Sequence, residues 1–278
     1  FPKEIGEEVA NAGPVEMNLD RGRLPLMAFE PRTASTDDTS PTADRPYPAA
    51  GSWNHELTHT HSNVVMSATF GYWKVRKVFT LASDYQLQTQ VTVSNTSTNS
   101  LNEADFYLLS GTSAMPNKSS TMMGQNFGTM WFDGDDAHKV DQGWFDNKPL
   151  GCMCMPGGDP RNNYSDGNNN VEWLGAYSRF FLQAVIPEES AASVNVHEFR
   201  LDSMSDADAA EEDVKVKNNQ MAWETAMAVK VPSLAPNAAK TFNYTLYVGP
   251  REYDRLKAIG AANGGNQFHL LMDFGKWF

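Results

Sequence analysis

Residues 85–93 have the sequence YQLQTQVTV, and this stretch indicates the fold more clearly than any other. One face of an extended chain would carry four apolar residues and a threonine, namely Tyr85, Leu87, Thr89, Val91 and Val93. Alternation with period two is typical of a strand that buries one face. Residues 74–81 alternate less regularly and are joined to this stretch by residues 82–84, so we predict an antiparallel hairpin.

Further strands are predicted downstream of this hairpin, at residues 106–109, 179–186, 193–201, 223–231 and 240–248. Residues 179–186 are almost continuously apolar, which predicts burial on both faces. One helix is predicted near the C-terminus, with Pro250 in its first turn and Gly260 at its end. Many strands and one short terminal helix predict an all-β sandwich.

Composition limits the classes of function. The chain has 278 residues, of which 41% are hydrophobic, enough for a packed core. With 22 Lys and Arg against 34 Asp and Glu, the formal charge is −12, which argues against a nucleic-acid partner. No apolar stretch approaches the ~18–20 residues of a membrane span, so the chain is expected to be soluble. Because it begins at Phe1 and stops at an aromatic cluster, we expect a fragment of a longer protein.

The strand pattern predicts a single sandwich domain over residues 1–278. Residues 1–52 are poorly assigned, and residues 31–52 resemble a loop because they are rich in Pro, Thr, Ser and Asp. Residues 113–171 contain many Gly and Asn residues and are too long for a structureless loop. We expect an insertion there, with short strands such as residues 129–132.

The sequence HELTH at residues 55–59 matches the H-E-x-x-H signature of zinc metalloproteases. That chemistry needs a helix, on which His55 and His59 share one face while Glu56 acts as general base. Prolines precede the motif and β-branched residues follow it, so a loop leading into a strand is the preferred interpretation. If this segment is a strand, His59 and His61 share one face and form an H-x-H pair, so adventitious metal binding at the surface is the second alternative. We predict no dedicated metal site.

Other reactive residues give weaker signals. Cys152 and Cys154 are too close in sequence to pair across an extended strand, and their oxidation state stays open. Acidic residues cluster at 133–136 and 202–213, but neither cluster has the spacing of a calcium loop. Neither a cofactor nor a catalytic residue is predicted.

Carbohydrate enzymes with a sandwich fold can use a histidine and a glutamate as acid and base. His138 and the pair His197-Glu198 supply these residue types, although the sequence does not bring them together. We therefore prefer the interpretation that they are surface residues of a strand and a loop.

Three segments resemble, in order, the periplasmic domain of YidC-type insertases of the YidC/Oxa/Alb family. Residues 77–95 resemble the family hairpin K-x-F-x-L…Y-x-[LV]…V-x-N, and residues 172–187 resemble its strand G-W-x-G-x-x-x-x-Y-F-x-x-A-x-I-P, with Glu172 in place of a glycine. Residues 234–251, LAPNAAKTFNYTLYVGPR, resemble its final strand, which closes in L-Y-x-G-P and leads into a short helix. The same C-terminal segment ends in residues 273–278, DFGKWF, which resemble the turn that precedes a membrane span.

This resemblance implies a large β-sandwich related in fold to galactose mutarotase, on the periplasmic side of a bacterial inner membrane. It implies a non-catalytic interaction module of a protein that inserts and folds membrane proteins, alone or with the Sec translocon. The expected partners are Sec subunits and nascent membrane proteins, and the membrane through flanking spans. Residues 250–278 would form a helix and a membrane-proximal connection, with Phe274, Trp277 and Phe278 in the interfacial belt. A carbohydrate-binding or mutarotase-like sandwich is the main alternative, and a zinc metalloprotease is a lesser one.

Overall fold

The computed structural model describes most of the strand-forming part of the chain. The described residues are 26–31, 54–59, 63–83, 85–114, 127–147, 158–200 and 221–274. In these ranges, none of the helices combines the length and hydropathy that crossing a bilayer requires.

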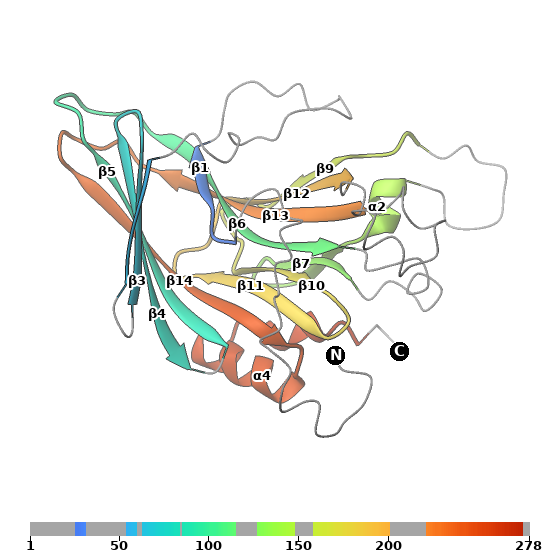
Figure 1. Ribbon diagram of the computed structural model, residues 1–278. Coiled ribbons are helices and arrows are strands. Elements are labelled where there is room, and N and C mark those ends of the chain that lie inside the picture. Colours follow the sequence, from blue (N-terminus) through green and yellow to red (C-terminus); the bar gives the residue numbers. More distant parts are fainter. Residues whose placement is uncertain are drawn as a thin grey trace, which may run out of the picture.

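Two antiparallel sheets face each other (Figure 1). The five-stranded sheet has the order β1 (Phe29–Pro31), β6 (Ala104–Ala114), β13 (Met221–Val231), β12 (Ser193–Arg200) and β9 (Asn163–Asp166). The nine-stranded sheet has the order β2 (Asn54–His59), β3 (Asn63–Phe70), β4 (Trp73–Ser83), β5 (Gln86–Asn95), β14 (Ala239–Pro250), β11 (Phe181–Pro187), β10 (Trp173–Tyr177), β7 (Gly128–Phe132) and β8 (Ala137–Val140). The predicted all-β sandwich is confirmed.

The predicted hairpin is present as β4 and β5, which pair antiparallel from Trp73 and Asn95 to Ser83 and Gln86. Along β5, alternate residues are buried, as the period-two pattern predicted. Tyr85 is an exception, because it lies in the turn with φ of 62° instead of in the strand. The left-handed backbone at this residue breaks the alternation, so the ring does not join Leu87 in the core and is 50% exposed.

The prediction that residues 179–186 are buried on both faces is confirmed for residues 182–186 of β11, whereas Arg179 and Phe180 lie in the turn before the strand and are exposed. Val185 contacts the core between the sheets, whereas Leu182, Ala184 and Ile186 contact the core on the opposite face. β11 lies between β10 and β14 in the nine-stranded sheet, so both of its faces are covered.

Residues 113–171, the expected insertion, contribute strands to both sheets. β7 pairs with β10 and β8, and β9 pairs with β12. This stretch also contains α2 (Gln142–Asp146), whose first turn is capped by the side chain of Asp141. The prediction of a single helix was wrong here, because a helix of five residues is too short to show a 3.6-residue period.

The main core lies between the two sheets. Its largest fully buried side chains include Trp131, Trp223, Phe106 and Phe145, and aromatic rings contact one another across it. The rings of Phe127 and Trp223 stack at 5.2 Å between centroids, for example. The alternating face of β5 thus packs against the second sheet, which is what the pattern in residues 85–93 required.

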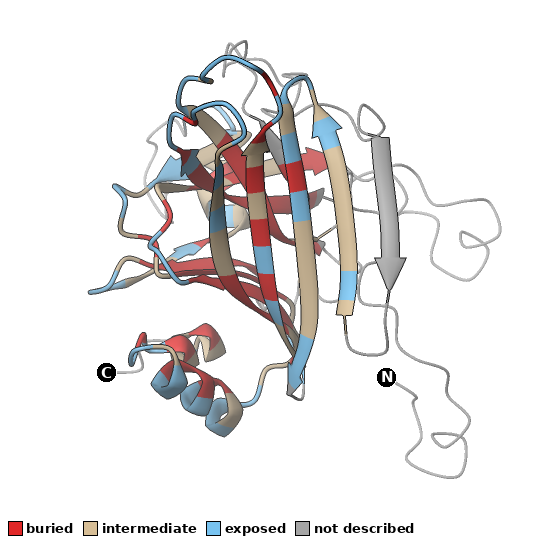
Figure 2. Cartoon of the chain, turned by 90° about the vertical axis from the view of Figure 1, so that its left-hand side faces the viewer, coloured by how far each residue is buried: buried red, intermediate tan, exposed pale blue. Residues whose placement is uncertain are grey.

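A second core lies on the other face of the nine-stranded sheet, under α4 (Tyr253–Ala262) and the 3-10 helix η3 (Phe268–Met272) (Figure 2). Leu256 of α4 is completely buried there. Phe268 of η3 is also fully buried and meets Trp173 and Tyr247 edge-on at 5.9 and 6.2 Å. Leu271, near the other end of η3, is buried against β10, where it lies next to Gly175.

The predicted helix exists, but its bounds were wrong at both ends. Pro250 is the last residue of β14, where it pairs with Phe181, and α4 begins three residues later. Gly260 does not end the helix, which continues to Ala262. It is buried inside it, where a Cβ atom would lie 3.0 Å from the backbone nitrogen of Phe268. This glycine therefore serves close packing between α4 and η3 and not chain reversal.

Arg251 fastens η3 to the sheet. Its guanidinium donates to the carbonyls of Leu271, Met272 and Ser178 at 2.7 to 3.0 Å, and it lies 4.5 Å from the ring centre of Tyr177. Burial lowers the pKa of Arg251 from its usual value, while Tyr177 and Asp273 favour the charged form. Arg251, which follows Gly249 and Pro250, thus holds α4 and η3 on the sandwich, and we call these two helices the C-terminal unit.

Candidate functional site

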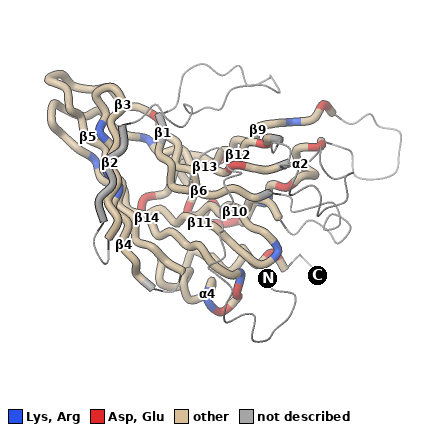
Figure 3. Tube along the Cα trace, viewed as in Figure 1, with Lys and Arg blue, Asp and Glu red and all other residues tan. Residues whose placement is uncertain are grey.

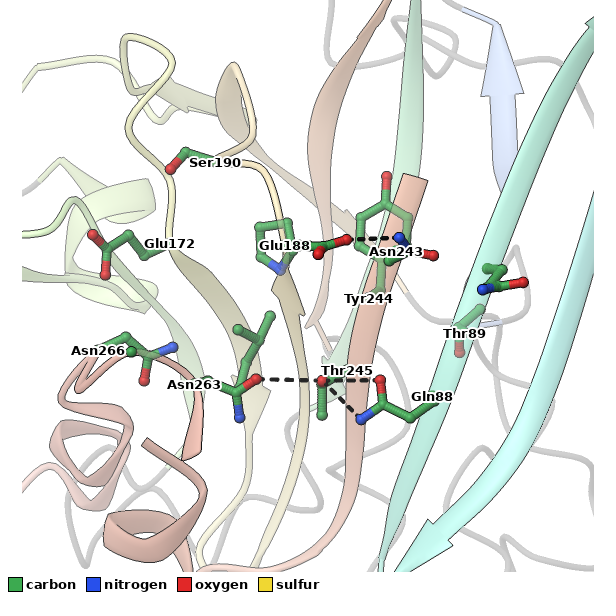
Figure 4. Close-up of a pocket in the computed structure, with 14 residues that line it drawn as sticks. Gln88, Thr89, Glu172, Glu188, Ser190, Asn243, Tyr244, Thr245, Asn263 and Asn266 are labelled. Carbon is green, nitrogen blue, oxygen red and sulfur yellow. Dashed lines mark hydrogen bonds between the residues drawn. The ribbon is translucent and has the colours of Figure 1, made fainter. Parts of the chain in front are cut away.

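A polar groove of about 790 Å³ opens on the face of the nine-stranded sheet that also carries α4 (Figure 4). It lies between strands β5, β14 and β11 on one side and the turn between α4 and η3 on the other. The lining residues are Gln88, Thr89, Gln90, Glu172, Ile186, Pro187, Glu188, Ser190, Asn243, Tyr244, Thr245, Asn263, Gly264 and Asn266. Side chains with amide, hydroxyl and carboxylate groups predominate.

The floor of the groove comes from the polar phase of two paired strands. Gln88 lies opposite Thr245, and Gln90 lies opposite Asn243, in the antiparallel register of β5 and β14. The Gln88 amide nitrogen donates to the Thr245 hydroxyl at 3.2 Å. Sequence analysis used only the buried phase of residues 85–93 and overlooked the other phase, although the glutamines were the available signal.

The turn after α4 forms the opposite wall. Asn263 caps the helix by donating from Nδ2 to the Ile259 carbonyl at 2.8 Å, and its Oδ1 accepts from the Thr245 hydroxyl at 3.4 Å. The backbone carbonyl of Asn266 accepts from the Trp173 indole at 2.7 Å. These contacts fix the wall to the floor, and no sequence pattern predicted them because the partners are far apart in the chain.

The electrostatic character of the groove is acidic. Glu172 and Glu188 line it, and Asn243 donates from Nδ2 to Glu188 at 2.6 Å, whereas none of the fourteen lining residues is Lys or Arg. In the part of the chain that the structure describes, Asn243 Oδ1 and Asn266 Oδ1 are buried and accept no hydrogen bond. The carboxylates of Glu172 and Glu188 and the amides of Gln88 and Gln90 suit a ligand that presents N–H groups, hydroxyls or cations.

The H-E-x-x-H motif lies in β2 and not in a helix. His55 and His59 are paired with Ala68 and Val64 of β3, so they are four residues apart on a strand. Four residues of strand separate them by ~13 Å, whereas zinc binds each ligand at ~2 Å. The helical zinc arrangement is therefore absent from β2, and His61 lies outside the described residues. Among the described residues, no group of three or more His, Cys, Asp or Glu side chains is placed so that it could hold a metal ion.

The acidic residues at 133–136 form a turn whose backbone N–H groups donate to the carboxylate of its first residue, Asp133. Asp133 accepts from the backbone nitrogens of Asp135 and Asp136 at 2.9 and 2.7 Å, and from His138 at 2.8 Å. These hydrogen bonds, chiefly those from Asp136 and His138, lower the pKa of Asp133 to about 2. The carboxylate is thus occupied by the turn between β7 and β8. Residues 202–213, Cys152 and Cys154 lie outside the described residues.

The histidine and glutamate considered as acid and base are not brought together. His138 stacks on Trp131 of the nine-stranded sheet, whereas His197 and Glu198 lie on β12 of the other sheet. His197 pairs with Asn163 at 2.6 Å, and Glu198, as the next residue of the strand, faces the opposite side. Burial and the nearby Asp146 raise the pKa of Glu198 to about 7.

Of the three aromatic residues expected near the membrane, Phe274 is described. Its ring is 65% exposed and lies 5.9 Å from that of Tyr253 on α4. Trp277 and Phe278 lie outside the described residues, so their predicted position stays a prediction.

Structural comparison found sugar-related proteins with low sequence identity. The chain is similar to a putative aldose 1-epimerase from Klebsiella pneumoniae (8% identity, TM-score 0.39, covering 77% of this chain and 58% of that one). It is also similar to an α-N-acetylgalactosaminidase from Bifidobacterium bifidum in complex with GalNAc (9%, 0.40, 78% and 31%) and to a putative mutarotase from Salmonella typhimurium (7%, 0.30, 80% and 71%). The chain thus spans 58% of the first of these proteins and about a third of the second.

Sequence comparison identifies the family. Among curated proteins, no sequence matched significantly. The family model of the YidC periplasmic domain matches residues 27–278, which include β1, both sheets and the C-terminal unit. That match spans nine-tenths of the chain and contains all three segments on which the resemblance was based. The chain belongs to the YidC periplasmic domain family.

Proposed function

We propose that this chain is a non-catalytic interaction module of a bacterial inner-membrane insertase, exposed on the periplasmic side. Its role is to contact subunits of the Sec translocon or segments of emerging membrane proteins while the membrane-embedded part of the insertase acts. Membership of the YidC periplasmic domain family supports this proposal. The polar groove supplies the contact surface.

The observation that carries the proposal is the chemistry of the groove. An extended polypeptide presents backbone N–H groups and, in basic segments, Lys and Arg side chains. The groove offers Glu172 and Glu188 as acceptors, together with two exposed glutamines on β5. Acceptors of this kind favour a donor-rich, cationic segment over an acidic one.

Site-directed photo-crosslinking in the full-length insertase tests the proposal. A photoreactive residue at Gln90, on the groove floor, should crosslink to a Sec subunit or a nascent membrane protein. The matched control is Thr92, which lies two residues further along the same face of β5 and outside the groove lining. Equal crosslinking at both positions, or none, together with full insertase activity after deletion of the domain, would contradict the role but not the family.

A carbohydrate-binding or mutarotase-like function is the second candidate. Amide and carboxylate side chains in one open groove are also the groups that hydrogen-bond sugar hydroxyls. A glycan array and a mutarotation assay on the 278-residue chain separate the two candidates. Clear turnover of a sugar, abolished by Gln90→Trp in the groove, would favour the second candidate over the first.

A further inference from the structure

Exposed apolar side chains gather at one end of the sandwich. Seven large apolar side chains are exposed in the described part of the chain, and five of them lie at this end, so they are clustered instead of scattered. The five, which we call the aromatic end, are Leu81 (69% exposed), Tyr85 (50%), Phe180 (53%), Tyr253 (38%) and Phe274 (65%). They come from the end of β4 and the β4–β5 turn, the turn before β11, the start of α4 and the segment after η3 (Figures 1 and 2).

Direct contacts join these segments into one surface. The Tyr85 carbonyl accepts from the backbone nitrogen of Val248, and the Phe180 carbonyl accepts from that of Arg251. Both acceptors therefore lie beside the C-terminal end of strand β14, just before α4 begins. The ring of Tyr253 at the start of α4 then contacts that of Phe274, which follows η3. The positions are thus set by backbone hydrogen bonds and not by loose loops.

Each exposed ring of the aromatic end except that of Phe274 has an Arg or Lys side chain over its face. Arg179 lies 5.1 Å from the ring centre of Phe180, Arg255 lies 5.0 Å from that of Tyr85, and Lys257 lies 5.6 Å from that of Tyr253. The acidic neighbours on α4 are Glu252, which pairs with Arg255 at 3.1 Å, and Asp254. Basic and acidic residues are interspersed along α4 (Figure 3), although the whole chain has a net charge of −12. This end therefore does not share the excess negative charge that would repel an anionic surface.

We propose that the aromatic end rests on the headgroup region of the membrane. Amphipathic rings and long cationic side chains are the groups that prefer this region, where the ring enters the acyl boundary and the cation reaches phosphate. The chain itself continues with the same chemistry, because Lys276, Trp277 and Phe278 follow Phe274 in the sequence. The family to which the chain belongs is a periplasmic domain of a membrane protein, so a lipid surface is the occupant that these observations favour over a second copy of the chain.

Vesicle flotation of the 278-residue chain tests this proposal. The vesicles contain phosphatidylethanolamine and phosphatidylglycerol at three to one, and the readout is the partition coefficient at low and physiological salt. The triple variant Leu81→Ser, Phe180→Ser, Phe274→Ser should reduce partitioning at least tenfold, because three exposed apolar groups no longer leave water. The matched control is Tyr72→Ser, which removes a ring of 63% exposure in the β3–β4 turn, away from the aromatic end.

A second variant and a second measurement keep the test decisive. Arg179→Glu combined with Lys257→Glu alters exposed charges only, so it retains the fold and should weaken binding several-fold, more at low salt than at high salt. Failure of the wild-type chain to float, or equal flotation of the wild type and the triple variant, would overturn the proposal. Sedimentation showing a dimer that the triple variant disrupts, without flotation, would assign the surface to a second copy instead. Gln90→Trp should leave flotation unchanged, so this proposal and the groove proposal fail separately.

Discussion

Glu198 is the residue whose environment makes the sharpest prediction about stability. It lies on β12, where burial and then Asp146 raise its pKa to about 7 from an ordinary value of 4.5. The folded chain therefore holds a proton on Glu198 more tightly than the unfolded chain does. At ~1.4 kcal/mol per pKa unit, this difference corresponds to about 3 kcal/mol. Because the side chain is only partly buried, screening by solvent reduces the expected effect to about 1–2 kcal/mol.

The sign follows from linkage between proton binding and folding. A group whose pKa is raised on folding contributes its full stability below the unfolded pKa, here 4.5, and that contribution is lost as the pH rises through about 7. Between pH 5 and pH 8, the wild type should therefore lose about 1–2 kcal/mol through Glu198. The variant Glu198→Gln should lack this loss, because its amide resembles the protonated carboxyl and does not ionise.

Urea unfolding at pH 5 and pH 8 measures the difference directly. Glu198→Gln should unfold close to the wild type at pH 5 and with a higher midpoint at pH 8, and a thermal scan should show a difference of about 2–4 °C per kcal/mol. Glu103→Gln, at an exposed carboxylate, is the control and should track the wild type at both pH values. If the gap between wild type and Glu198→Gln is the same at pH 5 and pH 8, the reasoning from burial is refuted.

Four other predictions concern the C-terminal unit and the metal question. Arg251→Lys should cost about 2–4 kcal/mol of unfolding free energy, because lysine cannot reach all the carbonyls that the guanidinium joins; urea unfolding measures the loss. Leu256→Ala should cost about 2–4 kcal/mol, since the side chain is fully buried against η3 and the sheet; an unchanged urea midpoint would contradict the packing described. Gly175→Val should destabilise by about 1–3 kcal/mol, because even a Cβ atom there lies 2.9 Å from Leu271 Cδ2; protection of η3 amides from hydrogen exchange should fall with it. EDTA should leave the melting temperature unchanged. If the motif at residues 55–59 held a structural zinc, EDTA would remove the zinc and lower the melting temperature.

Local patterns predicted the elements of the fold, and the register of the sheets could not be read from them. The alternation in residues 85–93 identified β5, its buried face and its pairing with β4, because period two is a property of one strand alone. The prediction was wrong for Tyr85, because this residue lies in the turn one position before β5 begins and has a left-handed backbone. Pro250 and Gly260 were misread because proline can end a strand as well as begin a helix, and glycine can allow close packing as well as end a helix. Strand pairing of Pro250 with Phe181 and the close approach of Phe268 to Gly260 decide between these roles.

The candidate site was harder to predict than the fold for a related reason. Gln88 and Gln90 were visible as the polar phase of a strand, which is the usual appearance of a solvated face. They become the floor of a groove only because Asn263 and Asn266, about 175 residues downstream, form a wall beside them. The aromatic end likewise needs the β4–β5 turn, the turn before β11 and α4 together. No window of sequence contains either surface.

Both proposed surfaces depend on the same small unit, which gives their combination a physical consequence. α4 begins at Tyr253 in the aromatic end and closes at Asn263 in the wall of the groove, and its ten residues span ~15 Å. Leu256, Phe268 and the Arg251 hydrogen bonds fix this unit to the sheet, so it behaves as a rigid spacer. If the aromatic end lies in the headgroup region, the groove wall at Asn263 is held within about one helix length of Tyr253. A polypeptide segment leaving the bilayer could then meet the groove within four or five extended residues. A change that loosens the unit, such as Leu256→Ala, should therefore weaken vesicle binding and groove crosslinking together, although it touches neither surface.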